Sequence, residues 1–423
     1  MRYVIRRIIP VISILLIIGI CLNGCYSPSE DLLSRMAAEE SGSRESGSEE
    51  SVSAVPASFD PDDDDLNVNW GYGCKLDGII YTINAAELYF IEENELKHIC
   101  RDPLCNHADV HCPSSKVITA ELVVTDGENL FCFGNYFDRN PKYDEAIEAG
   151  RIPDCEEYAY YNCIFKIDPR NQVLRVMTKW ISSGSNIPFL RTHGDYVYFL
   201  MVDKSFKSTL CRVKKNASGI EKVFSSENNS VTNVAFGDDC VLYRQGDSIY
   251  RADANFKNAE LCLDRITSFI TVKDDYIYYA VYYQKDYPCK GRQTSVRLHS
   301  ADLYRIPCKD WRDLTQAEKL LSGISPADDF AITDNGIIYR SWDPVSLGEG
   351  TSNGENIDYY NGKVMKLDLK TMGKSIVCSD FPKTVSESRL TYADERMSVF
   401  DSYDETFTLD NTTGQLIRMK REK

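Results

Sequence analysis

Cys100, Cys105, His107, His111 and Cys112 lie together in one short segment of the chain. Three thiolates and one imidazole form a tetrahedral ligand set for structural Zn²⁺. Cys100, Cys105, His107 and Cys112 are therefore candidate zinc ligands, and a structural zinc is the one cofactor that the sequence suggests. The spacing contains no CxxC pair, so it differs from that of a standard zinc knuckle.

Disulfide bonds are an alternative use of the same thiols. The chain has 15 cysteines, and an exported protein can keep disulfides that the cytosol would reduce. Free thiols are the third alternative. The sequence leaves three disulfide pairings open: Cys105 with Cys112, Cys100 with Cys74, and one of these thiols with Cys155 or Cys289.

Motifs of known catalytic sites are missing from the sequence. It has no GxSxG nucleophile turn, no HExxH zinc motif and no glycine loop that would cradle a phosphate. Acid pairs such as Asp238-Asp239 occur at predicted turns, where Asp bonds to the local backbone. We therefore expect a protein that is not an enzyme.

The first 25 residues have the features expected of an export signal. Arg2, Arg6 and Arg7 precede an apolar run that ends in Leu22-Asn23-Gly24-Cys25. This order resembles the signal of bacterial lipoproteins, which implies that residues 1–24 are removed and that Cys25 carries the lipid, including palmitate. An uncleaved transmembrane helix is the alternative, although the run is interrupted and shorter than the roughly 20 residues that span a bilayer.

A lipid on Cys25 would place the protein outside the cytoplasm and attach it to the lipid bilayer of the cell membrane. The formal net charge is −16. Nucleic acid is an unsuitable partner for so acidic a chain, because phosphates are bound by Lys and Arg.

Residues 25–65 differ in composition from the rest of the chain. Residues 26–65 contain ten Ser, twelve Asp or Glu and two basic residues. Such a segment buries too little apolar surface to offset the entropy lost on ordering. We expect a disordered acidic linker at 25–65 and a folded domain at 66–423.

A repeat recurs through the folded domain. A turn with Asp, Gly or Asn leads into a strand rich in Tyr and β-branched residues, and a second strand follows. The turns begin near residues 77, 126, 194, 238, 274, 334 and 394. Their spacing is typical of four-stranded propeller blades.

The repeat predicts an all-β fold, a β-propeller of seven four-stranded blades, with six or eight blades as alternatives. The segment 276–283 is apolar or aromatic on both alternating faces, as a sheet covered on both sides requires. Helical periodicity is nearly absent, and 314–321 is the best helix candidate.

Two repeated elements carry a family resemblance. Asp-x-Tyr-x-Tyr at 274–278 and Leu-Tyr-Arg-Ile at 303–306 resemble the TolB-like and YWTD-like repeats of bacterial β-propeller lipoproteins. Asp-Pro-x-Cys-x-His at 102–107 is similar to a segment of the same group, which implies a recurring structural clip. The resemblance implies the fold and no particular activity.

The longest insertions fall between second and third strands, at 134–161, 284–301 and 343–361. In an up-and-down blade these loops emerge on the same face as the connections between blades, one of which is 100–115. Long loops on a rigid scaffold commonly carry binding sites, and Tyr, Trp and Arg dominate recognition surfaces. The candidate ligand-binding residues are Tyr143, Tyr158, Tyr160, Tyr287, Arg292, Trp342 and Tyr359.

The sequence thus predicts a monomeric, membrane-anchored lipoprotein whose propeller binds a protein, peptide or glycan. One alternative is a cell-envelope enzyme, a glycan hydrolase or lyase with carboxylates at the channel. The other is a purely structural assembly component.

Overall fold

The computed structural model describes residues 71–100, 119–139, 145, 149–150, 158–171, 173–181, 189–203, 207–225, 231–237, 240–265, 267–288, 295–312, 316–325, 330–349, 355–382, 389–402 and 405–421. The predicted signal, Cys25 and the acidic linker lie outside these residues. Among the helices of the described part, none is both long and apolar enough to cross a membrane.

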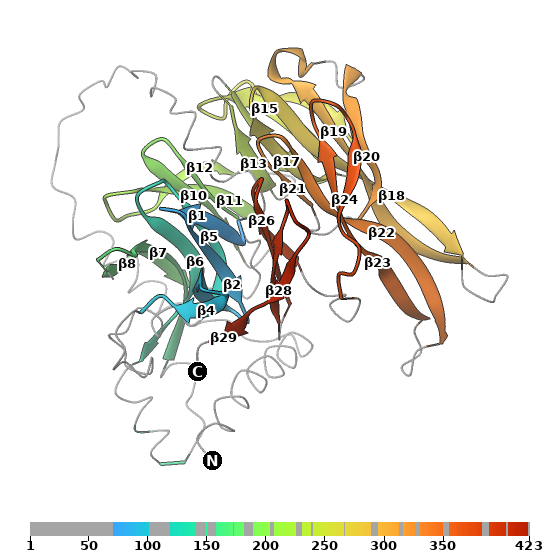
Figure 1. Ribbon diagram of the computed structural model, residues 1–423. Helices are drawn as coiled ribbons and strands as arrows, with labels where there is room; N and C mark the ends of the chain where they lie inside the picture. The colour runs from blue at the N-terminus through green and yellow to red at the C-terminus, as the bar shows by residue number, and fades with distance from the viewer. Residues whose placement is uncertain are drawn as a thin grey trace. The chain divides into compact units, whose positions relative to one another are not determined.

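The strands form seven four-stranded blades in sequence order (Figure 1). The strands of the first four blades are as follows. Blade 1 contains β1 (Gly73–Leu76), β2 (Ile79–Asn84), β3 (Glu87–Glu92) and β4 (Glu95–His98). Blade 2 contains β5 (Thr119–Thr125), β6 (Leu130–Arg139), β7 (Tyr158–Asp168) and β8 (Val173–Ile181). Blade 3 contains β9 (Leu190–His193), β10 (Tyr196–Val202), β11 (Ser208–Lys214) and β12 (Glu221–Ser225). Blade 4 contains β13 (Val231–Phe236), β14 (Cys240–Gln245), β15 (Ser248–Asp253) and β16 (Glu260–Asp264).

The last three blades and a closing strand complete the domain. Blade 5 contains β17 (Thr267–Lys273), β18 (Tyr276–Pro288), β19 (Ser295–Pro307) and β20 (Glu318–Ile324), with the 3-10 turn η2 (Cys308–Asp310) after β19. Blade 6 contains β21 (Phe330–Ile332), β22 (Gly336–Glu349), β23 (Glu355–Asp368) and β24 (Lys374–Cys378). Blade 7 contains β25 (Arg389–Ala393), β26 (Met397–Asp401), β27 (Thr406–Asp410) and β28 (Leu416–Arg418). Strand β29 (Lys420–Arg421) pairs in parallel with β4 of blade 1.

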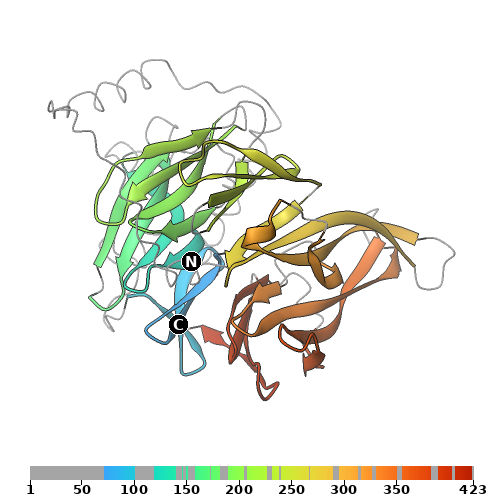
Figure 2. The same cartoon turned by 90° about the horizontal axis from the view of Figure 1, so that it is seen from above.

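Seven blades arranged in a ring confirm the predicted β-propeller. Seen from above, the colours follow the ring from blue through green and yellow to red, and the last blade lies beside the first (Figure 2). The first strand of each blade is the innermost one. The seven predicted repeat turns are the connections between first and second strands, as at Asp77-Gly78 and Asp274-Asp275. These four residues have positive φ angles, as a tight two-residue hairpin turn requires.

The core lies in the layers between neighbouring blades. Trp180 of β8 stacks on Phe199 of β10 with ring centroids 4.9 Å apart, which joins blades 2 and 3. Phe269 and Phe330 meet edge to face at 5.0 Å between blades 5 and 6. Both faces of a blade therefore bury apolar side chains, which explains the continuous apolar and aromatic runs in the second strands.

The repeated Tyr and Arg elements form a clip across three strands. In blade 3 the Arg212 guanidinium lies 4.0 Å from the Tyr196 ring centroid, and its Nε donates to Glu221 at 2.9 Å. In blade 5 Arg305 lies 5.0 Å from the Tyr276 ring and donates to Glu318 at 2.7 Å. In these two blades the clip ties the second, third and fourth strands together, so these Tyr and Arg side chains support the blade itself.

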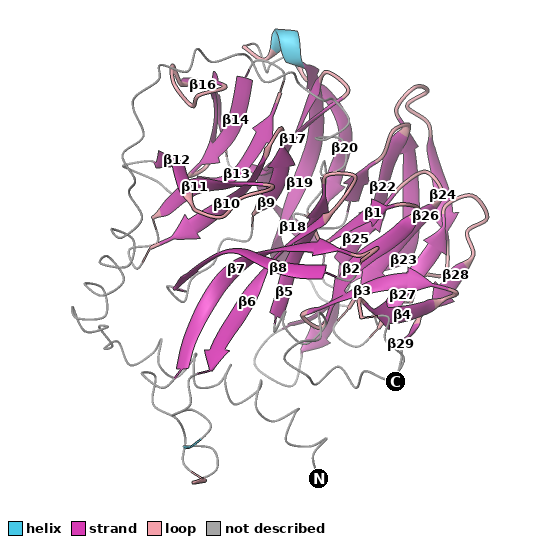
Figure 3. Ribbon diagram, turned by 90° about the vertical axis from the view of Figure 1, so that its left-hand side faces the viewer, coloured by secondary structure: helices cyan, strands magenta, loops and turns pink. Residues whose placement is uncertain are grey.

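Two expectations about local structure need correction. Much of the three long insertions is paired strand: β6 with β7, β18 with β19 and β22 with β23 continue as long hairpins (Figure 3). The second half of the best helix candidate, 314–321, is strand, because residues from Glu318 onward form β20. Pairing with β19 overrides the weak helical preference of so short a segment.

Candidate ligand pocket in the propeller channel

A cavity of about 480 Å³ lies where the first strands of five blades approach one another. Blades 1 and 7 supply most of its lining, and blades 2, 5 and 6 supply the rest. The lining residues are Gly71, Gly73, Lys75, Asp77, Gly78, Val123, Val124, Lys273, Ile332, Thr333, Asp334, Thr391, Tyr392, Ala393, Asp394, Glu395 and Arg396. Its volume falls within the range of small-molecule sites.

The cavity belongs to one end of the channel. Lys273 ends β17, Asp334 follows β21 and Asp394 follows β25, so the charged lining sits where first strands turn into second strands. We call this the turn end. The long hairpins β6–β7, β18–β19 and β22–β23 close at the opposite end, the hairpin end, because successive strands run antiparallel. The structure therefore separates the cavity from the face on which the sequence placed the aromatic candidates.

Asp394 organises the blade 7 side of the cavity. Its Oδ2 accepts from Lys75 Nζ at 2.7 Å and from the Tyr392 hydroxyl at 2.9 Å. Its Oδ1 accepts the backbone N–H groups of Arg396 and Met397, each at 2.8 Å. Burial by itself would raise the pKa of Asp394, but these donors outweigh burial and lower it. The carboxylate is thus ionised and fully occupied by the protein.

Tyr392 is held in its neutral form. Burial, and then the negative charge of Asp394, raise the pKa of its phenol. Its hydroxyl therefore serves as a hydrogen-bond donor to Asp394 and not as a base.

Blades 5, 6 and 7 are joined at the mouth of the cavity. Lys273 is a buried cation, with 4% of its side chain exposed, and its Nζ lies 3.0 Å from Oδ1 of the exposed Asp334. The next residue, Asn335, donates its backbone N–H to Glu395 Oε1 at 3.0 Å. Turns from three blades are thereby fixed relative to one another, which makes the rim a preformed surface.

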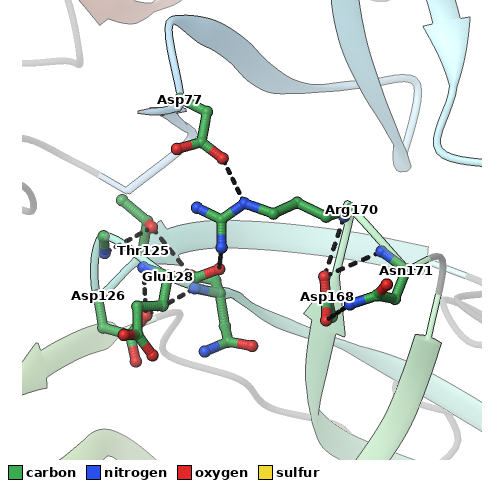
Figure 4. Close-up of polar contacts among 9 residues, drawn as sticks. Asp77, Thr125, Asp126, Glu128, Asp168, Arg170 and Asn171 are labelled. Carbon is green, nitrogen blue, oxygen red and sulfur yellow. Dashed lines mark hydrogen bonds and ion pairs between the residues drawn. The ribbon is translucent and has the colours of Figure 1, made fainter.

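On the blade 1 side, Asp77 is engaged by blade 2. Arg170 Nε donates to Asp77 Oδ2 at 2.6 Å, and Arg170 also reaches the Glu128 carbonyl at 3.5 Å (Figure 4). Hydrogen bonding from Arg170 lowers the pKa of Asp77. Asp168 accepts the backbone N–H groups of Arg170 and Asn171, so it holds the turn from which the arginine extends.

A buried carboxyl lies behind the cavity wall, at the seam between blades 1 and 7. Asp401 Oδ2 accepts from Thr82 at 2.5 Å and from Thr391 at 3.1 Å, and Thr391 itself lines the cavity. Burial raises the pKa of Asp401 to about 6, even though these hydroxyls favour the ionised form. Asn84 completes the cluster: it donates to the Ser402 carbonyl at 2.8 Å and accepts from Arg421.

The pKa values of two ionisable groups in the cavity are shifted away from neutrality. Asp394 is stabilised as the anion and Tyr392 as the neutral phenol, so neither has the near-neutral pKa of an efficient general acid or base. The lining combines apolar side chains, at Val123, Val124 and Ile332, with charges of both signs. Such a surface can orient a small polar ligand.

The predicted aromatic candidates fall on the long hairpins or outside the described residues. Tyr158 and Tyr160 lie on β7, Tyr287 on β18, Trp342 on β22 and Tyr359 on β23, and only their backbone is described. The structure does not describe Tyr143 and Arg292. The proposed recognition face therefore stays a prediction.

Most of the candidate zinc site also lies outside the described residues, since Cys105, His107 and Cys112 belong to the connection between β4 and β5. Cys100, which follows β4, is buried. Within the described ranges no group of three His, Cys, Asp or Glu could hold a metal ion. Cys74 is a free thiol in the core, so the proposed pairing of Cys100 with Cys74 is not formed.

Sequence reasoning missed the cavity. Its lining includes Asp-containing turns, which the sequence indicates only as places where the chain reverses direction. It also includes the cations Lys75, Lys273 and Arg396. A signal was available, because each cation lies within three residues of a repeat turn, but no sequence pattern states which blades meet across the channel.

Comparisons with known proteins gave matches among solved structures only. No protein-family model matches the chain, and no curated protein matches its sequence. The chain is similar in structure to the β-propeller domain of the trilobed protease from Pyrococcus furiosus, at 11% identity over 72% of this chain and 83% of that one, with a TM-score of 0.41.

Two further solved structures are similar to a comparable degree. One is from a nidogen/laminin complex, at 7% identity over 62% of this chain and 92% of that one, TM-score 0.38. The other is a prolyl endopeptidase, at 8% identity over 83% of this chain and 48% of that one, TM-score 0.44. The neighbours are β-propeller proteins, as the repeats predicted. At these identities the likeness concerns the fold alone.

Proposed function

We propose that this protein is a noncatalytic binding module whose propeller captures a small ligand in the cavity at the turn end of the channel. The observation that carries the proposal is the cavity itself, a volume of about 480 Å³ whose rim is fixed by contacts between blades. A preformed rim lowers the entropy that is lost when a ligand binds.

The ionisation states in the cavity support binding rather than catalysis. A hydrolase or lyase acting there would need a carboxyl poised to give or take a proton. Asp394 and Asp77 both have lowered pKa values and stable partners, which suits a positioning role.

The proposal is tested by titrating the full chain, purified in detergent, with a library of amino acids, short peptides, oligosaccharides and organic acids. Calorimetry should detect a ligand whose affinity falls about tenfold or more in Arg396→Gln, which removes a charge from the rim. Arg418→Gln, at the outer strand of blade 7, is the matched control and should leave affinity unchanged. A failure of every compound to bind, or binding that is indifferent to Arg396→Gln, contradicts the proposal.

The hairpin end offers a separate test of the predicted recognition face. Replacing residues 140–157, between β6 and β7, with a short Gly/Ser linker changes this face and spares the cavity. If the cavity is the site, the ligand found above binds this variant as it binds the wild type. Loss of that ligand, with the fold intact by circular dichroism, would move the site to the hairpin end.

The predicted lipid anchor on Cys25 accords with a module of this kind, because an anchor and an acidic linker would present the propeller outside the cytoplasm. Cys25→Ser should release the chain from the membrane fraction and abolish incorporation of labelled palmitate in a bacterial expression host. Cys21→Ser is the control and should change neither. Retention of Cys25→Ser in the membrane would instead indicate an uncleaved helix.

A further inference from the structure

The geometry points to a small zwitterion, of the amino-acid or short-peptide kind, as the ligand of the cavity: its carboxylate lies at Lys75 and Arg396 and its ammonium group at Glu395. This inference rests on the proposed function and names the class of ligand for the same cavity.

The charges of the cavity nearly balance. Lys75, Lys273 and Arg396 face Asp77, Asp334, Asp394 and Glu395, and Arg170 from blade 2 offsets Asp77. In a chain whose formal net charge is −16, this balance marks the cavity as locally neutral. A ligand with a large net charge of either sign would lose part of its attraction there, whereas a dipolar ligand would not.

Most of these charges already have partners. Lys273 pairs with Asp334 at 3.0 Å, Arg170 with Asp77 at 2.6 Å and Lys75 with Asp394 at 2.7 Å. Asp394 accepts four hydrogen bonds, so it has no capacity left for a ligand. A ligand must therefore find its partners among the groups that remain.

The remaining donors sit on blades 1 and 7. Lys75 uses one N–H on Asp394 and keeps two, and 39% of its side chain is exposed. Within the described part of the chain, the exposed Arg396 guanidinium has no ion-pair partner. An ammonium and a guanidinium on one cavity suit a carboxylate, because charge-assisted hydrogen bonds are the strongest that a side chain offers.

Among the carboxylates that line the cavity, Glu395 is the one without an ion pair to a described residue. Its Oε1 accepts the Asn335 N–H at 3.0 Å, which fixes the side chain, and the carboxylate forms no ion pair with a described residue. It adjoins Arg396 in the sequence and both residues line the cavity, so the cavity presents one available charge of each sign. That arrangement favours a zwitterion, because a simple anion would leave Glu395 without a partner and a simple cation would leave Arg396 without one.

A zwitterion at this place would also join the two ends of the ring. Lys75 belongs to blade 1 and Arg396 to blade 7, so one carboxylate bound by both adds a contact across the seam that β29 and the Lys75–Asp394 pair already close. Ligand binding should therefore raise the thermal midpoint of the domain in proportion to occupancy.

Matched alanine peptides test the inference. The full chain in detergent is titrated by calorimetry with L-alanine, L-alanyl-L-alanine, its N-acetyl derivative and its C-terminal amide. We expect L-alanyl-L-alanine or L-alanine to bind about tenfold more tightly than either capped form, because each cap removes one charge-assisted contact. The relative affinities of L-alanine and L-alanyl-L-alanine show whether the ligand is a free amino acid or a peptide.

Two variants assign the contacts. Arg396→Gln should weaken dipeptide binding to the level of the amide, and Glu395→Gln should weaken it to the level of the acetylated form, while Arg418→Gln leaves all four affinities unchanged. Equal binding of capped and uncapped forms, or binding of none of them, overturns the inference. A different library compound that still needs Arg396 would then leave the proposed function standing and reject only the zwitterion.

Discussion

Lys75 and Asp394 are 319 positions apart in the sequence, yet their side chains meet at 2.7 Å across the seam between blades 1 and 7. The contact lies at the rim of the cavity and on the line along which the ring closes. The proposed binding site and the closure of the ring therefore share this pair.

Replacing Asp394 should cost more stability than replacing Lys75. Asp394→Ala removes the acceptor of four hydrogen bonds, and we expect it to lower the free energy of unfolding by about 2 kcal/mol. Lys75→Gln leaves those turn contacts in place and should cost less than about 1 kcal/mol, because the ion pair is partly exposed. Urea unfolding followed by tryptophan fluorescence measures both. Lys97→Gln, which removes an ion pair within blade 1, is the control, and equal losses for Lys75 and Asp394 would contradict the assigned roles.

The buried Asp401 should make the domain more stable in mild acid. Its pKa is raised to about 6 by burial, above the roughly 4 of an unfolded chain, so the folded state binds the proton more tightly. Its contribution to stability therefore increases as the pH falls from 7 towards 4. The difference of about two pKa units between the folded and the unfolded chain corresponds to about 3 kcal/mol of stability. Asp401→Asn should therefore remove the rise of the thermal midpoint between pH 7 and pH 5. A wild-type midpoint that falls steadily over this interval would be inconsistent with a buried ionisable Asp401.

Stability should fall again in stronger acid. Asp168, Asp253, Asp368 and Asp410 close third-to-fourth-strand turns, and hydrogen bonds from the turns lower their pKa values. Their contribution is present above the unfolded pKa of roughly 4 and is lost as the pH falls through the lower folded values. Asp368→Asn should weaken the decline below pH 4 in thermal scans. If the thermal midpoint falls below pH 4 as steeply in Asp368→Asn, in Asp410→Asn and in the double variant as in the wild type, other groups cause the decline.

The Arg clips of blades 3 and 5 should respond alike to substitution. Lys keeps the charge of Arg212 but loses the planar fork that stacks on Tyr196 while donating to Glu221. We expect Arg212→Lys and Arg305→Lys each to lower stability by about 1 kcal/mol in urea unfolding. Arg418→Lys, at an exposed pair, should have little effect, and a similar loss there would mean that the stacked geometry is unimportant.

Gly73 should not tolerate a side chain. A Cβ at this position would lie 3.0 Å from the backbone oxygens of Thr391 and Tyr81, which belong to rigid strands. We expect Gly73→Ala to cost about 2 kcal/mol through forced separation of blades 1 and 7. In Gly237→Ala the nearest contact is 3.4 Å, to the Cys240 side chain, so this control should cost less. Equal losses of stability in Gly73→Ala and Gly237→Ala would show that blades 1 and 7 can separate to make room for the side chain.

Core thiols should be unreactive in the native protein. Burial raises the pKa of Cys74 and Cys132, and that of Cys211 to about 11, so thiolate is scarce at pH 8. Iodoacetamide should leave all three unmodified until urea unfolds the chain, as peptide mass spectrometry would show. Native labelling of Cys74 at the rate of the denatured chain would mean that blade 1 opens readily.

The sequence by itself determined the fold to the level of the blade. Asp-containing turns at a recurring spacing, followed by Tyr-rich strands, are local features, and each predicted turn connects the first two strands of one blade. The Tyr196–Arg212 and Tyr276–Arg305 pairs are local in the same way, because each is a contact within a single sheet.

Only the tertiary structure decided where the cavity lies. Lys75, Lys273 and Asp394 come from blades 1, 5 and 7, and their proximity depends on closure of the ring, which no local pattern encodes. The long insertions drew attention to the hairpin end because aromatic side chains concentrate there. The cavity formed at the turn end, since the small and charged residues that line it acquire a common site only when five first strands converge on the channel.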